Sequence, residues 1–276
     1  MLLACSVLAP SLPELGGVSL LGDPWLDASL LLIVGVIAGV INTMAGGGSL
    51  LVLPILIGLG LPAGVANGSS RLAAATQSAA AAATLHRRGV RAHQLSARLA
   101  GPMIGGALLG SWLVTLLDDW LFRVLLGVML LAWAVILLVQ PDRFLRPPDE
   151  QREPNATSYV LAVAVGIYGG ALQAAVGFLL IALLSGQLGY DLVRANSVKV
   201  TLVLAYTLVV LPVFVLADQV AWLPAIVLAI GTVVGAWAGA RWQLEKGSAV
   251  VRWFVLVMVL ISGLAMLWPI VAGWLG

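Results

Sequence analysis

Long apolar runs alternate with short polar stretches along almost the whole chain. The runs are continuous, which favours helices, because the strands of a membrane barrel alternate apolar and polar positions. Six of the ten runs have the ~20 residues that a transmembrane helix needs. The pattern therefore predicts an all-α polytopic membrane protein. The ten runs cover residues 28–43, 49–61, 64–85, 95–117, 121–140, 158–175, 177–189, 193–217, 220–242 and 251–275.

Two pairs of neighbouring runs are shorter and are interrupted by glycine. One pair is 28–43 with 49–61, and the other is 158–175 with 177–189. Irregular backbone inside a membrane is tolerated only where protein or a water-filled cavity surrounds it. We therefore expect a broken or re-entrant helix in each half of the chain. The break in the first half is expected at Gly46, Gly47 and Gly48.

The composition narrows the class of protein further. Hydrophobic residues make up 61% of the 276 positions and charged residues only 9%, whereas a soluble domain carries about 25% charged residues. So few charges cannot cover a water-exposed surface, which excludes a soluble enzyme, a disordered chain and a nucleic-acid-binding protein. The expected partners are membrane lipids and a small anionic substrate, and a homodimer is compatible with the sequence. The single cysteine, Cys5, excludes an intramolecular disulfide.

The positions of Lys and Arg predict the orientation, because cytoplasmic loops carry an excess of both. Basic residues cluster after the third and the ninth runs, and acidic residues after the fourth and the eighth. The expected organisation is an extracytoplasmic N-terminal segment (1–27), a first transmembrane repeat (28–140), a cytoplasmic linker (141–157) and a second transmembrane repeat (158–276). Both termini are then extracytoplasmic, in a bacterial cytoplasmic membrane. The basic residues are Arg87, Arg88, Arg91, Arg98, Arg241, Lys246 and Arg252, and the acidic ones are Asp118, Asp119 and Asp218.

The two halves of the chain align without gaps when they are offset by 129 positions. Each half holds five apolar runs, and an odd number of crossings inverts the second half relative to the first. Inverted repeats are the architecture of many secondary transporters, whose binding site lies near the middle of the membrane where broken helices meet. The sequence therefore predicts two inverted repeats. The matched positions include Gly48 with Gly177, Gly60 with Gly189, Asn67 with Asn196, Gly106 with Gly235, Gly110 with Gly239 and Arg123 with Arg252.

Two basic residues, Arg71 and Lys199, lie inside apolar runs. At about 1.5 Å per residue, Arg71 lies roughly 12 Å below one membrane surface and Lys199 roughly 10 Å below the other. Such a charge costs about 2.5–3.5 kcal/mol and normally has a partner. All twelve Asp and Glu residues lie in termini, loops or the ends of runs. We therefore predict that the two cations bind an anionic substrate. The alternative is that they bind backbone carbonyls of the broken helices or extend to the membrane surface.

Polar residues beside the two cations fit an oxyanion. The guanidinium of Arg71 offers a planar fork for two oxygens and Lys199 offers a point charge, while the dipoles of helix N-termini add to the attraction. The run around Arg71 also predicts a helix packed on every side, because 17 of the 22 residues from Ala63 to Thr84 are Gly, Ala, Ser or Thr. The candidate substrate-binding residues are Arg71, Lys199, Asn67, Ser70, Asn196, Gly46, Gly47 and Gly48, with Gln77 and Gln173 either in the same polar pathway or in packing hydrogen bonds.

Four glycine-rich motifs stand in the first half: Gly35–Gly39, Met44–Pro54, Gly60–Pro62 and Ala66–Ser70. Together they resemble the TauE/SafE sulfite-exporter family of membrane transporters, and the resemblance covers nearly the whole chain. It implies the transport of sulfite, of organosulfonates such as sulfoacetate, or of related small anions. The second half departs from this pattern, since Gly177-Phe178 replaces Gly48-Ser49 and Leu183 replaces Pro54. The role of glycine turn is therefore carried over only to Gly46–Gly48.

These observations predict a secondary transporter that moves a small oxyanion across the membrane by alternating access. The sequence holds no nucleotide-binding motif, so the energy would come from an ion gradient, the membrane potential or the substrate gradient. No cofactor and no metal are expected. An anion channel with the same site is one alternative. An intramembrane enzyme is a weaker one, because His86 and His93 lie in the basic loop and Ser69 and Ser70 have no neighbouring base in the sequence.

Overall fold

The computed structural model describes residues 23–44, 46–90, 93–139 and 151–243, and these residues form helices and no strand. The predicted all-α class is confirmed for this part of the chain. The expected tenth run, 251–275, lies outside the described residues. The helices are α1 (Pro24–Met44), α2 (Ser49–Gly58), α3 (Ala63–Arg87), α4 (His93–Thr115), α5 (Asp119–Val139), α6 (Ala156–Ala171), α7 (Val176–Ile181), the π-helical turn η1 (Ala182–Gln187), α8 (Leu192–Leu216) and α9 (Trp222–Gln243).

The helices follow the predicted runs closely. Helices α3 and α8 begin at Ala63 and Leu192, within one residue of the corresponding runs. Helix α1 begins at Pro24, before the expected start at residue 28, because the Asp23 carboxylate accepts a hydrogen bond of 2.8 Å from the backbone N–H of Trp25. An acidic side chain that caps the first N–H groups stabilises a helix start, and proline suits the first helical position.

Four of the described helices are long and apolar enough to cross a membrane, namely α1, α4, α8 and α9. Helix α3 is as long as α8, with 25 residues, but its Ala, Gly and Ser content lowers its hydropathy. It packs against both α8 and α9, so its small side chains lie against other helices, as the sequence predicts. By the length and composition of its helices, the chain is a multi-pass membrane protein.

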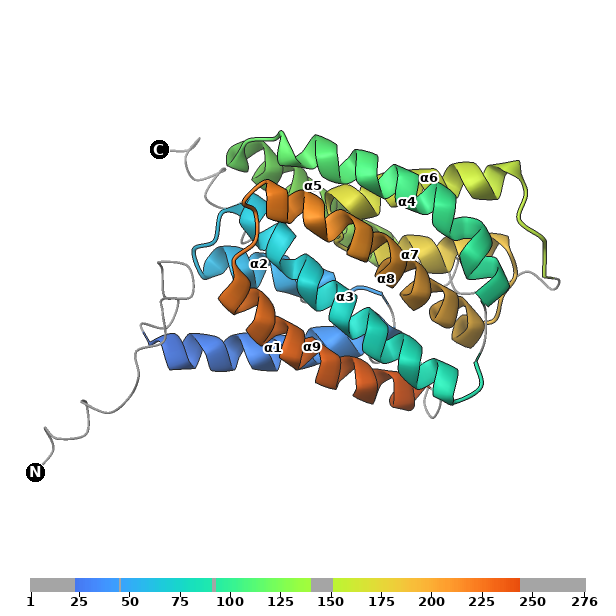
Figure 1. The fold of residues 1–276 in the computed structure, drawn as a ribbon, viewed down its shortest axis with the longest axis horizontal. Coiled ribbons are helices and arrows are strands. Elements are labelled where there is room, and N and C mark those ends of the chain that lie inside the picture. The colour runs from blue at the N-terminus through green and yellow to red at the C-terminus, as the bar shows by residue number, and fades with distance from the viewer. Residues whose placement is uncertain (1–22, 45, 91–92, 140–150, 244–276) are drawn as a thin grey trace, which may run out of the picture.

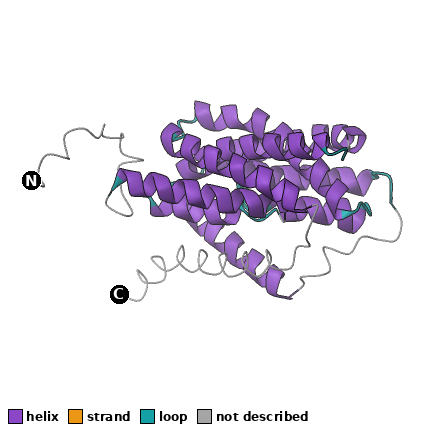
Figure 2. Ribbon diagram, turned by 90° about the horizontal axis from the view of Figure 1, so that it is seen from below, coloured by secondary structure: helices purple, strands orange, loops and turns teal. Residues whose placement is uncertain are grey.

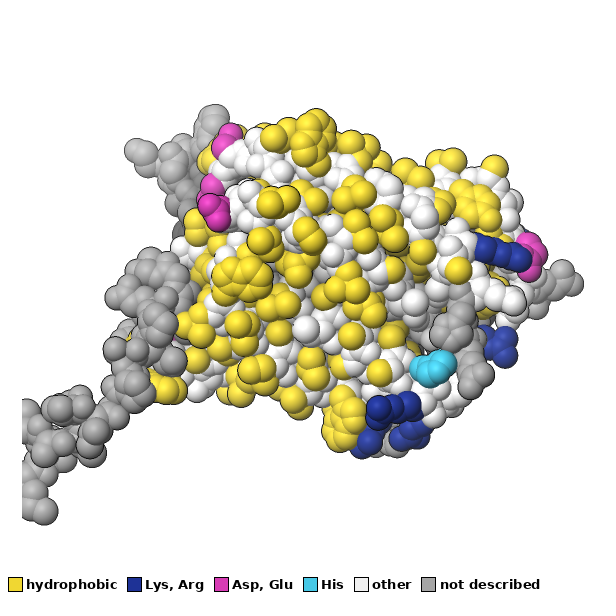
Figure 3. Space-filling model, viewed as in Figure 1, with side chains coloured by type: hydrophobic (Ala, Val, Ile, Leu, Met, Phe, Trp, Pro, Cys, Tyr) yellow, Lys and Arg dark blue, Asp and Glu magenta, His cyan; other side chains and the backbone are white. Residues whose placement is uncertain are grey.

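The long axes of the helices are roughly aligned (Figure 2), and charged side chains gather at the two ends of the bundle (Figure 3). Asp118, Asp119 and Asp218 lie near the start of α3, which we call the acidic end, and Arg87 and Arg88 lie at the other end of α3, which we call the basic end. The surface between the two ends is largely apolar in Figure 3. Helix α3 begins at the acidic end and crosses the bundle to the basic end (Figure 1).

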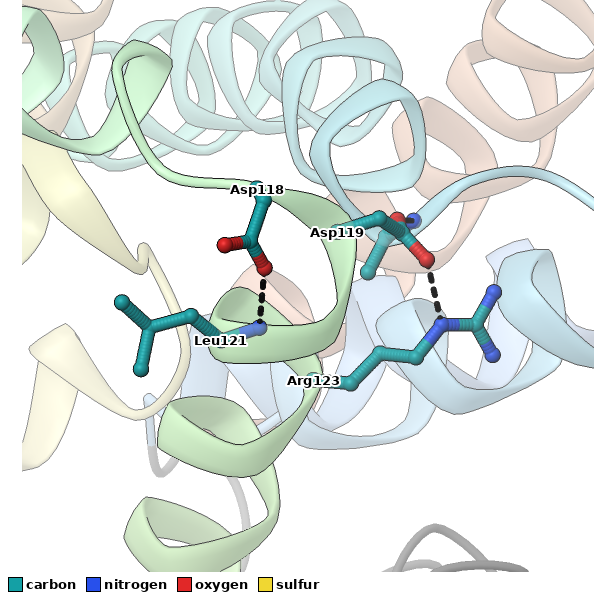
Figure 4. Close-up of polar contacts among 5 residues, drawn as sticks. Asp118, Asp119, Leu121 and Arg123 are labelled. Atoms are coloured by element: carbon teal, nitrogen blue, oxygen red, sulfur yellow. Dashed lines mark hydrogen bonds and ion pairs between the residues drawn. The ribbon is translucent and has the colours of Figure 1, made fainter.

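Hydrogen bonds at the acidic end fix the start of α3 (Figure 4). The Asp119 carboxylate accepts a hydrogen bond from the backbone N–H of Ala63 and another, of 2.6 Å, from Nε of Arg123. The neighbouring Asp118 accepts from the backbone N–H of Leu121 at 2.7 Å and caps α5. The first turn of α3 is therefore tied to the first turn of α5.

Both predicted helix breaks are present. Helix α1 ends at Met44 and α2 begins at Ser49, whereas α6 ends at Ala171 and α7 begins at Val176. We call these two interruptions the first break and the second break. Each break leaves the last carbonyls of one helix and the first N–H groups of the next without partners in their own helix. Other parts of the chain must satisfy them.

The second broken helix re-enters the bundle. Helix α6 begins near an ion pair between Arg98 and Glu153 at the basic end. After η1, the carbonyl of Leu188 accepts a hydrogen bond of 2.9 Å from the backbone N–H of Arg152. The chain therefore enters with α6 and returns with α7 and η1 to the same end of the bundle.

Glycines bring α1 close to α9 and α6 close to α4. A Cβ atom at Gly235 would lie 2.0 Å from the carbonyl oxygen of Val36, and one at Gly110 would lie 2.0 Å from that of Ile167. Such distances leave no room for a side chain, so these glycines permit helices to touch along their backbones. Each close pair joins a helix from one half of the chain to a helix from the other.

Candidate substrate-binding site

The two breaks meet inside the bundle at a pair of glycines. A Cβ atom on Gly46 would lie 2.6 Å from the Cα of Gly177, and a Cβ atom on Gly177 would lie 2.3 Å from the Cα of Gly46. Gly46 also has a φ angle of +89°, a left-handed conformation that favours glycine. A Cβ atom on Gly48 would lie 2.0 Å from the carbonyl oxygen of Ala38. With the buried Gly47 between them, these residues form the glycine turn that the sequence predicts.

Arg71 binds the end of α6 at the second break. Its side chain is fully buried. Atom Nη2 donates to the carbonyls of Gly170 at 2.7 Å and Ala171 at 3.1 Å, and atom Nη1 donates to the carbonyl of Gly169 and to Oε1 of Gln173 at 2.6 Å. The last carbonyls of a helix carry a partial negative charge. The guanidinium therefore caps the C-terminal end of α6.

Lys199 makes the corresponding contact at the first break. Its Nζ donates to the carbonyl oxygens of Asn42 at 2.8 Å and Thr43 at 3.3 Å, in the last turn of α1. The side chain is only 2% exposed. Arg71 belongs to the first half of the chain and Lys199 to the second. Each cation therefore caps the broken helix of the other half.

Among the described residues, neither cation forms an ion pair with an acidic side chain. The ion pairs there are Arg98 with Glu153, Arg123 with Asp119, and Arg194 with Asp191. The contacts of Arg71 and Lys199 match the alternative stated above, in which they bind backbone carbonyls. Their extension to the membrane surface is ruled out, because both side chains are buried. A role for either cation in substrate binding stays a prediction.

Two of the predicted neighbours, Asn67 and Ser70, lie in the same polar network as Arg71. Asn67 is buried, and its Nδ2 donates to the carbonyl of Ala171 at 2.7 Å while its Oδ1 accepts from Arg71 at 3.3 Å. Ser70 donates its hydroxyl to the carbonyl of Asn67 at 2.7 Å. Asn196 is fully buried on α8, one helical turn before Lys199. Asn67 therefore helps Arg71 to hold the end of α6.

Gln173 links Arg71 to the second half of the chain. Its backbone has a φ angle of +58°, which is uncommon for a residue with a side chain. Its side-chain oxygen Oε1 accepts two hydrogen bonds, from Nη1 of Arg71 at 2.6 Å and from the hydroxyl of Tyr206 at 2.7 Å. Because both partners are donors, the atom they share must be the amide oxygen. The amide nitrogen Nε2 is then on the side of the carboxamide that faces away from Arg71 and Tyr206.

A small cavity adjoins Gln173 between α1, α2, α3 and α9. It has room for about one water molecule. Ser49 connects its wall to the second break, because its hydroxyl donates to the backbone carbonyl of Gln173 at 3.2 Å and accepts from the backbone N–H of Ala175 at 3.2 Å. Four of the lining residues are Ala or Val. The lining residues of other types are Gly48, Ser49, Ser70, Gln77, Gln173 and Thr232.

Sequence reasoning placed part of this lining and missed the rest. Ser49 was not singled out as a candidate, although it directly follows the glycine turn, and neither was Thr232, the only hydroxyl residue in the α9 sequence. Tyr206 was also missed, because nothing in an apolar run marks one tyrosine as a partner of a distant side chain. The structure does not bring Lys199 or Asn196 into the cavity lining. The predicted residues that do line it are Gly48, Ser70, Gln77 and Gln173.

The sequence profile described as "Sulfite exporter TauE/SafE" matches residues 31–266. This range contains both breaks, both buried cations and the whole cavity. The chain belongs to the TauE/SafE family. The resemblance drawn from the glycine-rich motifs is therefore confirmed, and TauE/SafE membership makes the chain a member of a membrane transporter family.

Several TauE/SafE relatives carry a general name. A probable membrane transporter protein of Haemophilus influenzae is 27% identical over 235 residues, which cover 83% of this chain and 90% of the relative. The probable membrane transporter protein YfcA of Escherichia coli is 26% identical over 231 residues, which cover 83% and 85% of the two chains. A third, ORF9 of a Sinorhizobium species, is 22% identical over 230 residues and covers 83% and 88%. No solved structure matches the chain.

Proposed function

We propose that this chain is a secondary transporter that moves a small oxyanion, such as sulfite or an organosulfonate, across the cytoplasmic membrane by alternating access. The observation that carries the proposal is the small cavity beside the junction of the two breaks, with the buried cation Arg71 directly behind it. Anion sites of transporters lie where broken helices meet near the middle of the membrane. Membership of the TauE/SafE family supports the same class of substrate.

An inverted repeat underlies this proposal, and the helix bounds support it. Helix α3 starts at Ala63 and α8 starts at Leu192, 129 positions later, and both helices have 25 residues. Helices α4 and α9 start at His93 and Trp222, again 129 positions apart. This is the offset at which the two halves of the sequence align without gaps.

Left-handed backbone positions support the repeat independently of the helix bounds. Positive φ angles occur at Gly46 and Ala175, at Gly60 and Gly189, and at Gly89 and Asp218. The two members of each pair are separated by 129 positions. Four of these six residues are glycine, but Ala175 and Asp218 are not, so the shared conformation does not follow from residue type alone. The same turns therefore recur in the two halves.

The orientation in the proposal follows from the charges at the two ends. Arg87, Arg88 and Arg241 lie at the C-terminal ends of α3 and α9, so the basic end faces the cytoplasm by the rule that cytoplasmic loops are rich in Lys and Arg. The acidic end, with Asp118 and Asp119, then faces outward. In this orientation α1 enters from outside and α6 enters from the cytoplasm, as two inverted halves would.

In this conformation the cavity is smaller than a sulfonate group, so the transport cycle requires the walls of the cavity to separate. The two halves of the chain touch through backbone at Gly46 and Gly177 and through the carbonyl contacts of Arg71 and Lys199. These contacts hold the junction together while the cavity opens to one side or the other. The described residues contain no group of three or more potential metal-ligating side chains.

A binding screen and a current measurement test the proposal. Purified protein should unfold at a higher temperature in the presence of at least one of sulfite, sulfoacetate and taurine, because a ligand that binds only the folded state stabilises it. Sulfate and small carboxylates complete the screen. Absence of a shift with every anion would contradict the proposal. Unitary currents carried by sulfite across a planar bilayer would favour an anion channel with the same site instead.

A further inference from the structure

Among the described polar side chains around the cavity, only two have donors that are not already used. The hydroxyl groups of Ser49, Ser70 and Thr232 each donate to a backbone carbonyl, at 3.2, 2.7 and 3.0 Å. The carboxamides of Gln77 and Gln173, in contrast to these hydroxyl groups, keep unused N–H donors. Gln77 makes no hydrogen bond with the described residues, and Gln173 uses only its oxygen. The N–H groups of these two carboxamides therefore remain free to bind a ligand.

Arg71 lies behind this wall and does not line the cavity. Its two terminal nitrogens are directed at three backbone carbonyls and at the side chains of Asn67 and Gln173. A guanidinium has five N–H donors. Of the three side-chain nitrogens of Arg71, Nε is the one that lacks a hydrogen-bond partner among the described residues. The hydrogen bond to Gln173 therefore connects the positive charge to a residue of the cavity wall and occupies the oxygen of its carboxamide.

At an offset of 129 positions, several residues equivalent to the cavity lining are larger apolar or aromatic ones. At the offset of 129 positions, Gln77 corresponds to Tyr206, which is fully buried. Ser49 corresponds to Phe178, which packs against Trp133 with ring centroids 5.4 Å apart. The same offset replaces Ala38 by Ile167, Ala74 by Val203 and Thr232 by Met103.

We propose that the chain holds a single oxyanion site, in which the carboxamides of Gln77 and Gln173 donate to the oxygens of a sulfite or sulfonate group. Arg71 is a positioning residue that orients Gln173, and the equivalent place in the second half is closed by Tyr206 and Phe178. This inference rests on the proposed function. In the prediction from the sequence, Arg71 and Lys199 bind the anion directly. Here the neutral carboxamides contact the anion instead, and each chain binds one anion.

Isothermal titration of purified full-length protein with sulfite tests the site. The variant Gln77→Leu should weaken binding by about 10- to 100-fold, as expected when hydrogen bonds to a charged ligand are lost. Its unfolding temperature without sulfite should not change, because Gln77 makes no hydrogen bond with the described residues. The control is Gln94→Leu, the same change at an exposed position on α4, which should bind like the wild type. Equal affinity in wild type and Gln77→Leu would overturn the inference.

Ala74→Val provides a second test that removes no polar group. It introduces into the cavity wall the residue that the second half carries at Val203, so it should weaken sulfite binding by narrowing the cavity. The titration should also give about one sulfite per chain, and a value near two would overturn the single site. If wild-type protein binds none of sulfite, sulfoacetate and methanesulfonate, the proposed function itself fails, whatever the variants do.

A double-mutant cycle tests the positioning role of Arg71. If Arg71 acts on the anion through Gln173, then Arg71→Lys should lower affinity in the wild type and should have little further effect in a Gln173→Leu background. A purely structural role would lower the unfolding temperature in both backgrounds without this coupling in affinity. Effects on affinity that add independently would show that Arg71 contacts the anion directly and would overturn the assignment.

Discussion

The guanidinium of Arg71 donates a hydrogen bond of 2.6 Å to the side-chain oxygen of Gln173, although 102 residues separate them in the sequence. This bond connects α3, the helix of the first half that carries Arg71, to the second break. It also turns the amide nitrogen of Gln173 away from Arg71, since Tyr206 occupies the same oxygen. A buried cation, a helix break and a residue of the cavity wall are thereby joined in one network.

Replacing Arg71 by alanine should affect both stability and binding. The change removes the guanidinium from the carbonyls of Gly169, Gly170 and Ala171. Gly169 still accepts from the backbone N–H of Gln173 and Ala171 from Asn67, so the carbonyl of Gly170 loses most, and a buried acceptor left unpaired costs about 1–3 kcal/mol. We expect a lower unfolding temperature together with loss of sulfite binding. Thermal unfolding and titration on the same preparation measure both. An Arg71→Ala protein that unfolds and binds like the wild type would contradict this account of the site.

Replacing Lys199 should disturb the first break instead. In Lys199→Met the carbonyls of Asn42 and Thr43 lose their ammonium partner, and with it the favourable interaction of a cation with the end of α1, worth about 0.3–2 kcal/mol. We expect slower transport and a lower unfolding temperature, with partial recovery in Lys199→Arg. Uptake by Lys199→Met at the wild-type rate would show that this contact is dispensable.

A methyl group at the meeting point of the breaks should be poorly tolerated. In Gly46→Ala the new Cβ would lie 2.6 Å from the backbone of Gly177 and the residue would keep a φ angle of +89°, so both a collision and a strained backbone result. Gly101→Ala is the matched control, because its Cβ would meet nothing within 4 Å and alanine favours a helix. Expression and monodispersity in detergent should fall for Gly46→Ala and stay unchanged for Gly101→Ala. The reverse order would refute the assigned packing.

Labelling of single cysteines tests the orientation. In a Cys5→Ser background, Arg88→Cys at the basic end and Ala217→Cys at the acidic end are both exposed positions. A membrane-impermeant maleimide added to intact cells should label Ala217→Cys at once and Arg88→Cys only after the membrane is made permeable. Labelling of Arg88→Cys in intact cells would invert the proposed topology.

The helices could be predicted from the sequence, but the partners of the buried cations could not. The starts of α3 and α8 follow from apolar runs, and the depth of Arg71 follows from counting residues along one of them. The contact between Arg71 and Gly170 depends on how two helices about a hundred residues apart pack together, and no local pattern carries that information. For the same reason, the two hydrogen bonds that fix the oxygen of Gln173 cannot be predicted from the sequence.

Counterflow of radiolabelled sulfite into proteoliposomes tests the central claim most directly. Liposomes that hold unlabelled sulfite and wild-type protein should accumulate labelled sulfite transiently and saturably, because a carrier exchanges one bound anion for another. Gln94→Leu should behave in the same way, and Gln77→Leu should lose at least ~10-fold in rate at low sulfite concentration. Absence of counterflow in the wild type would contradict a sulfite carrier, and equal rates in all three proteins would contradict the site at the junction of the two breaks.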